Sequence, residues 1–246
     1  PGARPAAVTL PLAGRTALVT GASRGIGAAI ARALASAGAR VALVSRSQAA
    51  LEALAAELPH EPVVMADDLA QPAAAATLAA SALEAFGSAP DILVLSAGTF
   101  PLGAADAASD EEIDLAFELN AMAPLRLLRE FVPAMRTRES GHIVFIGSLA
   151  DRHVFPSNAV YAASKHAARA VAEALRAESR DSGVRTTLVS PAATNTPIWD
   201  PHDPDAQAHL PNRDEMLRPD DVADAVLWAV TRPAHVNVDE LRLSRS

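Results

Sequence analysis

The fold is decided by Thr16 to Gly27, a stretch that reads TALVTGASRGIG. Its first five residues form an apolar run typical of a buried strand, and a helical pattern follows from Ile26 to Ala37. The glycines at 21, 25 and 27 let the backbone turn tightly and approach a pyrophosphate, which the free N–H groups of the helix start can bind. Because the triplet lies directly between a strand and a helix, it predicts a dinucleotide-binding βαβ unit.

Short apolar runs alternate with alanine-rich helical stretches along the rest of the chain, which predicts βαβ units and a parallel sheet. The fold class is therefore α/β, a single doubly wound parallel sheet of the Rossmann type with helices on both faces. A glycine cap is expected at Gly38. Strands are predicted at Thr16–Thr20, Val41–Ser45, Pro62–Ala66, Ile92–Ser96, His142–Gly147, Thr186–Ser190 and Val236–Leu243. Helices are predicted at Ile26–Ala37, Gln48–Leu58, Ala73–Phe86, Glu111–Met135, Ser157–Ser182 and Pro219–Val230.

The predicted domain organisation is simple. Residues 1–11 are rich in proline and alanine and are predicted to be a flexible N-terminal arm. Residues 12–246 form one dinucleotide-binding catalytic domain. Within it, residues 192–217 are polar and carry four prolines, and so long a loop in a compact domain is usually functional. We predict a substrate lid there, the alternative being a tolerated surface insertion.

Composition excludes several classes of function. Half of the 246 residues are apolar, the net charge is −8, and no basic cluster favours nucleic acid or an anionic membrane surface. The chain has no cysteine, so thiol catalysis and thiolate metal sites are excluded. It shows neither a membrane-spanning apolar stretch nor a signal pattern, so we expect a cytoplasmic protein.

One tyrosine and one lysine, Tyr161 and Lys165, lie four residues apart. Four residues is about one helical turn, so in a helix both side chains project from one face. The ammonium favours phenolate and is expected to lower the tyrosine pKa, which makes the pair an acid–base device. The alternative is that two rare residues share a solvated helix face by chance.

The end of the second predicted strand bears on the choice of dinucleotide. A carboxylate there accepts the ribose 2′-hydroxyl of NAD, but this chain has Ser45-Arg46 instead. A guanidinium suits a 2′-phosphate, and Arg24 in the glycine loop can approach the same phosphate from the other side. The pattern predicts NADP(H), unless both arginines are only solvated loop charges.

The chain resembles the short-chain dehydrogenase/reductase family over essentially its whole length from about Leu12. The resemblance rests on the T-G-x-x-x-G-x-G loop, the Y-x-x-x-K pair, Ser148 thirteen residues before Tyr161, and Asn120 further upstream. It implies that Tyr161 is the general acid/base and that Ser148 hydrogen-bonds the substrate oxygen. It implies that Lys165 holds the nicotinamide ribose and lowers the tyrosine pKa, and that Asn120 supports a proton relay through water to Lys165. Taken alone, Ser148 could be a strand-end cap and Asn120 a helix-interior kink.

The resemblance also implies a set of cofactor contacts. Two positions depart from the family pattern: Leu95-Ser96-Ala97-Gly98 stands where Asn-Asn-Ala-Gly is common, and Pro191-Ala192 where Pro-Gly is common. We expect Ser96 to reduce sheet rigidity and Ala192 to narrow the substrate pocket. The predicted cofactor-binding residues are Gly21, Ser23, Arg24, Gly25, Ile26, Gly27, Arg46, Asp68, Leu69, Ser96, Ala97, Gly98, Tyr161, Lys165, Pro191, Ala192 and Thr194.

Ser148, Tyr161, His153 and Trp199 are the predicted substrate-contacting residues, although His153 could be an ordinary loop histidine. We predict no metal site. His202, Asp203, Asp205 and His209 resemble loose metal ligands, but they lie in an irregular segment and lack a helical His spacing.

The predicted reaction is hydride transfer between NADP(H) and a carbonyl or secondary alcohol, with reduction the favoured direction. The family's β-ketoacyl reductases commonly end in a Gly-Gly tail, whereas this chain has Val236-Asn237-Val238-Asp239-Glu240-Leu241. That favours a small ketone, keto ester or hydroxy acid as substrate. The alternatives are a β-ketoacyl-type reductase and a non-catalytic regulatory protein that senses NADP(H). The resemblance further implies a homodimer or homotetramer built across the helices containing Asn120 and Tyr161.

Overall fold

The computed structural model describes residues 10–246, which form one parallel sheet of seven strands in the order β3-β2-β1-β4-β5-β6-β7. Every neighbouring pair of strands is parallel. The strands are β1 (Thr16–Thr20), β2 (Arg40–Ser45), β3 (Val63–Ala66), β4 (Ile92–Leu95), β5 (Gly141–Ile146), β6 (Val184–Pro191) and β7 (Glu240–Leu243).

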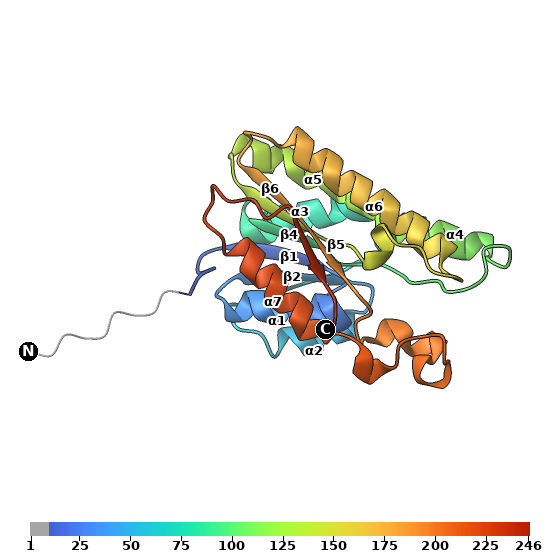
Figure 1. Cartoon of the computed structure of the whole chain (residues 1–246). Coiled ribbons are helices and arrows are strands. Elements are labelled where there is room, and N and C mark those ends of the chain that lie inside the picture. The colour runs from blue at the N-terminus through green and yellow to red at the C-terminus, as the bar shows by residue number, and fades with distance from the viewer. Residues whose placement is uncertain (1–9) are drawn as a thin grey trace, which may run out of the picture.

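Helices cover both faces of this sheet, so the predicted doubly wound fold is confirmed (Figure 1). The helices α1 (Gly25–Ser36), α2 (Gln48–Ala55) and α7 (Pro219–Val230) pack on one face. The helices α3 (Ala74–Phe86), α5 (Ala123–Thr137) and α6 (Ala159–Glu178) pack on the other. The helix α1 ends as predicted beside Gly38, whose φ of +104° favours glycine.

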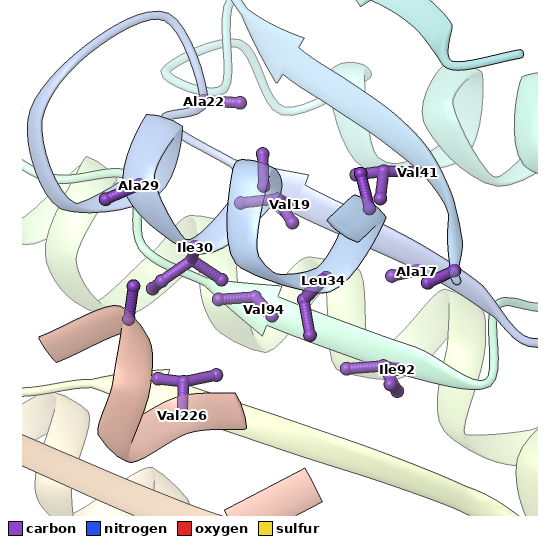
Figure 2. Packing of buried hydrophobic residues seen from close by; sticks show 14 of the residues in the cluster. Ala17, Val19, Ala22, Ala29, Ile30, Leu34, Val41, Ile92, Val94 and Val226 are labelled. Carbon is purple, nitrogen blue, oxygen red and sulfur yellow. The ribbon is translucent and has the colours of Figure 1, made fainter. Parts of the chain in front are cut away.

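Small and branched apolar side chains fill the layer between the sheet and α1. Figure 2 shows Ile30 and Leu34 of α1 against the side of the sheet that carries Val19 of β1 and Val94 of β4. Val226 reaches the same cluster from α7. All five side chains are fully buried, and burying one such side chain stabilises the fold by about 1.5–3 kcal/mol.

The strand order places the site. The chain reverses its direction across the sheet between β1 and β4, which lie side by side although two strands separate them in sequence. Ligands of open α/β sheets bind at such a switch point, outside the carboxyl ends of the strands. The glycine loop after β1, Ser96 after β4 and Ser148 after β5 all lie at that edge.

Two predicted elements differ most from those observed, while the ends of several others shift by a few residues. The helix predicted over Glu111–Met135 consists of α4 (Asp110–Phe117), a π-helical turn at Glu118–Met122 and α5. The strand predicted over Val236–Leu243 begins only at Glu240. The cause is Asn237, whose side-chain amide bonds both the N–H (3.0 Å) and the carbonyl (3.2 Å) of Thr186, in place of a backbone ladder.

The predicted arm lies outside the described residues except for residues 10 and 11, which lead into a turn where the Leu12 N–H donates to Ala37 O at 2.9 Å. The predicted lid, residues 192–217, is not a structureless loop. It contains short 3₁₀ helices at Pro197–His202, Pro204–Ala206 and Arg213–Glu215. A bridge between Thr194 and Leu217 closes its base.

Candidate active site

The glycine loop is shaped by contacts that only glycine permits. Gly21 and Gly25 have φ values of +68° and +58°, which L side chains rarely adopt. Gly27 is needed for a different reason, because a Cβ there would lie 2.3 Å from Gly21 O. A Cβ on Gly21 would lie 2.9 Å from Ala97 Cα. Ser23 and Ile26, between the glycines, are half-buried, and the loop leaves its backbone open to a close-fitting group.

The helix that follows this loop is prepared for an anion. It begins at Gly25 with no side-chain cap on its first N–H groups and no acidic residue in its first turn. The unsatisfied donors and the positive end of the helix dipole both favour a phosphate at this position. The structure therefore fits the predicted dinucleotide cradle at the level of the backbone.

Arg24 and Arg46 are both exposed, the first in the glycine loop and the second directly after β2. Among residues 10–246, neither guanidinium makes a hydrogen bond or an ion pair, although most other arginines of the chain do. Both groups are therefore left with all their donors for an external anion, and a guanidinium matches a phosphate in geometry and charge.

Thr20 joins the glycine loop to the turn after β4. Its hydroxyl donates to Val94 O (3.2 Å) and accepts from the N–H groups of Ser96 (3.0 Å) and Ala97 (3.1 Å). The backbone of this turn is thus held by Thr20 and not by the Ser96 side chain. Gly98, which is exposed, lets the Asn120 side chain approach this turn, because a Cβ there would be 2.5 Å from Asn120 Oδ1.

The other predicted cofactor residues also lie at carboxyl ends of strands. Asp68 follows β3 and accepts the Ala70 N–H at 3.1 Å, while the neighbouring Leu69 is buried. Pro191 ends β6, and the Ala192 N–H donates to Leu243 O at 2.8 Å. Thr194, also buried, donates its hydroxyl to Ala192 O at 2.9 Å.

Tyr161 and Lys165 project from one face of α6, as their spacing predicts. Lys165 Nζ lies 5.7 Å from the centroid of the Tyr161 ring and donates to Ile146 O at 3.0 Å. An ammonium has three N–H donors, and among the described residues only this one is bound. Ser148 hydrogen-bonds Tyr161, and its hydroxyl also accepts the Ala150 N–H at 3.1 Å. Ser148 is therefore both a cap and a partner of the tyrosine.

Burial, and not the ammonium, decides the ionisation of the pair. Burial raises the pKa of Tyr161 to about 12, an effect that the hydrogen bond from Ser148 partly offsets and the Asp151 charge reinforces. Burial lowers the pKa of Lys165 to about 8, and Asp151 acts against that change. The prediction that the tyrosine pKa is lowered is therefore wrong. Lys165 is mostly charged at neutral pH, and Tyr161 is a phenol that can donate a proton.

Asn120 lies in the π-helical turn and is fixed by its side chain. Its amide donates to Thr99 O (3.0 Å) and to Ser164 Oγ (2.9 Å), while its Oδ1 accepts the Thr99 N–H at 3.0 Å. Ser164 in turn donates to Tyr161 O at 2.8 Å. Asn120 thus ties the turn after β4 to α6, and the relay through water to Lys165 stays a prediction.

The segment 192–217 contacts both sides of this site. A Cβ on Gly25 would lie 3.1 Å from the Thr196 side chain, so the segment touches the glycine loop. On the other side, the Phe100 ring lies 4.7 Å from the Tyr161 ring and 4.9 Å from the ring of Trp199, which is buried. His202 Nε2 bonds Phe100 O at 3.0 Å. Trp199 therefore reaches Tyr161 only through Phe100.

The family model for short chain dehydrogenases matches residues 15–207. The chain belongs to the short-chain dehydrogenase family. It is 38% identical over 238 residues to the glycine betaine reductase ATRR of Emericella nidulans, a match that covers 94% of this chain. It spans only 19% of that relative's length.

Solved structures agree with the family. A metagenomic short-chain oxidoreductase in complex with NADP is 35% identical with a TM-score of 0.82, over 96% of this chain and 99% of that one. The alcohol dehydrogenase from the archaeon Thermococcus sibiricus, complexed with 5-hydroxy-NADP, is 31% identical with a TM-score of 0.84, over 93% and 95% of the two chains. The predicted family, its oxidoreductase class and a nicotinamide cofactor are confirmed.

The remaining predicted substrate residue, His153, is exposed. Its Nε2 lies 3.3 Å from a guanidinium nitrogen of Arg242, which belongs to β7. No group of three or more His, Cys, Asp or Glu side chains in residues 10–246 is arranged to hold a metal ion. Over the same range, no helix is both long and apolar enough to cross a membrane.

Sequence reasoning missed three residues at the site of this dehydrogenase. Phe100 lies against Tyr161, Ser164 links α6 to Asn120, and the fully buried Asp151 follows Ser148 by three residues. Two had a local signal, since Ser164 directly precedes Lys165 and Asp151 is a lone acid in a short turn. Phe100 had none, because only the folded chain brings it to Tyr161.

Proposed function

We propose that this short-chain dehydrogenase catalyses NADP(H)-dependent reduction of a small carbonyl compound, or the reverse oxidation of its secondary alcohol. The observation that carries the proposal is the arrangement around Tyr161. The half-buried Tyr161 bonds the Ser148 hydroxyl, and the centroid of its ring lies 5.7 Å from the Lys165 ammonium. A carbonyl oxygen needs a proton source and a second hydrogen bond, and these two side chains supply both.

The chain's own groups divide the work as follows. When bound, the nicotinamide cofactor supplies the hydride to the carbonyl carbon. Tyr161 donates its phenolic proton to the carbonyl oxygen, and the Ser148 hydroxyl donates a hydrogen bond to the same atom. Lys165 holds the nicotinamide ribose with the two donors that Ile146 leaves free, and its charge favours the phenolate that forms. A relay that includes Asn120 returns a proton to Tyr161.

The preference for NADP(H) is supported by Arg24 and Arg46. Both guanidinium groups are exposed and without partners in residues 10–246, one in the glycine loop and one directly after β2, where we expect the ribose 2′-phosphate. No carboxylate follows β2, where one would accept the 2′-hydroxyl of NAD. The NADP complexes of similar chains support the same choice.

The substrate class is supported by the surroundings of Tyr161. Phe100 and Trp199 form an aromatic wall beside the phenol, and the segment 192–217 is the proposed lid that carries Trp199. Ala192, which directly follows β6, is the residue that we expect to narrow the substrate pocket. These features fit a small ketone, keto ester or hydroxy acid. A long β-ketoacyl chain is the alternative substrate of the same reaction.

A homodimer or homotetramer is part of the proposal. Three large apolar side chains, Leu115, Met122 and Leu125, are 38–42% exposed on α4, the π-helical turn and α5. Such side chains on the helices that flank Asn120 suit contact with a second copy of the chain. Sedimentation of the wild type beside Met122→Lys tests this, and a monomeric wild type contradicts it.

The proposed activity is tested by following NADPH and NADH oxidation with a panel of ketones, keto esters, aldehydes and β-ketoacyl thioesters. We expect turnover with at least one small carbonyl compound and a preference for NADPH. Tight NADPH binding without turnover on any class of carbonyl would instead support the regulatory protein that senses NADP(H).

A further inference from the structure

Asp151 is a buried carboxylate that the proposed reaction leaves without a role. Its side chain is 0% exposed, in the short 3₁₀ turn Leu149–Asp151 that follows Ser148. Its Oδ2 accepts a short hydrogen bond from the hydroxyl of Ser190, and its Oδ1 accepts from Arg152 Nε at 2.9 Å. A buried carboxylate is retained only where such partners offset its desolvation.

This carboxylate lies directly under the catalytic end of β5. Its Oδ2 is 2.8 Å from the position that a Cβ on Gly147 would take, so glycine is what lets it approach. Gly147 joins Ile146, whose carbonyl accepts from Lys165, to Ser148, which bonds Tyr161. The carboxylate thus contacts the residue that lies between Ile146, the partner of Lys165, and Ser148, the partner of Tyr161.

The charges around Asp151 come from three elements. The turn that carries Asp151 packs against α6, the helix of Tyr161 and Lys165, and Arg152 pairs with Asp151 from its own turn. Glu240 of β7 pairs with the far side of Arg152 at 2.5 Å. Beyond that pair, Arg242 of β7 contacts the exposed His153. The field of Asp151 raises the pKa of both Tyr161 and Lys165.

We propose that Asp151 is a positioning residue that keeps Lys165 an ammonium ion and Tyr161 a phenol. This proposal rests on the proposed function. Its bonds to Ser190 and Arg152 also hold the turn that presents Ser148. Both effects prepare the site for reduction, which needs a proton on Tyr161 and a charge on Lys165. A purely structural role, in which Asp151 only neutralises Arg152, is the competing explanation.

The two explanations predict different effects when the negative charge of Asp151 is removed. In Asp151→Asn the side chain keeps its size, and the pKa values of Tyr161 and Lys165 both fall, by about one pH unit for a nearby buried charge. The alkaline limb of NADPH-dependent reduction moves to lower pH by the same amount, because Lys165 and Tyr161 both lose their protons earlier. A structural role alone changes rate or stability but leaves the position of that limb unchanged.

The composition of the chain allows the pKa values of Tyr161 and Lys165 to be measured without turnover. Tyr161 is its one tyrosine and Lys165 its one lysine, so phenolate absorbance and the ¹⁵N signal of labelled lysine each report a single site. The test titrates both groups in the untagged wild type, in Asp151→Asn and in the matched control Glu240→Gln. We expect a downward shift of both pKa values in Asp151→Asn and none in Glu240→Gln.

A second variant covers the case in which Asp151→Asn does not fold. Arg152→Gln leaves the carboxylate and removes the cation beside it, so both pKa values should rise. Unchanged titrations in the folded variants, or equal shifts in Glu240→Gln, overturn the proposal. Because these titrations need no substrate, they remain decisive even if the wild type reduces none of the panel carbonyls, which would count against the proposed function alone.

Discussion

The glycine loop and the segment 192–217 touch each other at Gly25 and Thr196, but different forces shape them. The loop is set by steric contacts between backbone atoms, such as the 2.3 Å that would separate a Cβ on Gly27 from Gly21 O. The segment is set by side chains far apart in sequence, with Trp199 on Phe100 and Arg213 bonded to Asp200. We therefore expect backbone geometry to bind a cofactor common to many enzymes, and exchangeable side chains to bind the specific substrate.

The largest effect expected from this contrast is that of Gly27→Ala. The added Cβ overlaps Gly21 O, so the loop has to open, and overpacking of this kind costs about 1–3 kcal/mol of stability. We expect NADPH affinity to fall by about 100-fold or more and the unfolding temperature to drop. Titration of NADPH fluorescence and thermal unfolding measure the two effects.

The matched control is Gly103→Ala, because a Cβ at Gly103 meets no atom within 4 Å and its φ is not left-handed. This variant should bind NADPH as the wild type does. Equal losses in the two variants would mean that the contacts of Gly27 do not shape the cradle.

The second largest effect is expected from a change of charge, and not of backbone shape, in the cofactor region. In Arg46→Asp, loss of a charge-assisted contact worth about 1.5–3 kcal/mol should weaken NADPH binding by about 10- to 100-fold. NADH, which lacks the 2′-phosphate, should bind with nearly unchanged affinity. Calorimetric titration of both cofactors gives the ratio. Arg32→Asp, an equal charge change at an arginine paired with Glu57, controls for net charge. An unchanged NADPH-to-NADH ratio in Arg46→Asp removes Arg46 from the phosphate site.

The smallest effect is expected in the segment 192–217. Arg213 bonds Asp200 (2.7 Å) and Asn195 (3.1 Å), and exposed pairs of this kind contribute about 1 kcal/mol or less. Arg213→Ala should raise KM for the carbonyl compound about threefold to tenfold, with NADPH affinity within about twofold of the wild type.

The control for Arg213→Ala is Arg218→Ala, which removes an exposed pair with Asp221 at the start of α7, outside the segment. Steady-state kinetics in both substrates compare the two variants. If Arg213→Ala changed NADPH affinity and left KM for the carbonyl compound unchanged, the segment would belong to the cofactor site and not to a substrate lid.

The same contrast explains what could be predicted from the sequence. Local patterns were sufficient for the sheet, the glycine loop and the spacing of Tyr161 and Lys165, because a turn or a helical face depends on neighbouring residues. The helix ends were less accurate, and the helix predicted over 111–135 contains a π-helical turn at Asn120. Asn120 is held there by Thr99 and Ser164, contacts that exist only in the folded chain.

The electrostatic state of the site depends on burial, which the sequence does not report. The spacing of Tyr161 and Lys165 suggested a lowered tyrosine pKa, but desolvation raises it to about 12. The role of Phe100 was equally out of reach, since it lies 61 residues before the tyrosine that its ring contacts. The β7 boundary was missed because Asn237 replaces backbone pairing with a side-chain amide.

The most direct test of the central claim is hydride transfer measured in a single turnover with NADPH-saturated Tyr161→Phe, using a carbonyl compound that the wild type reduces. Phenylalanine keeps the ring against Phe100 and removes only the proton donor. We predict NADPH affinity within about twofold of the wild type and a rate of hydride transfer lower by about 10²- to 10⁴-fold. A rate within tenfold of the wild type, with NADPH bound normally, would contradict the assignment of Tyr161 as the acid.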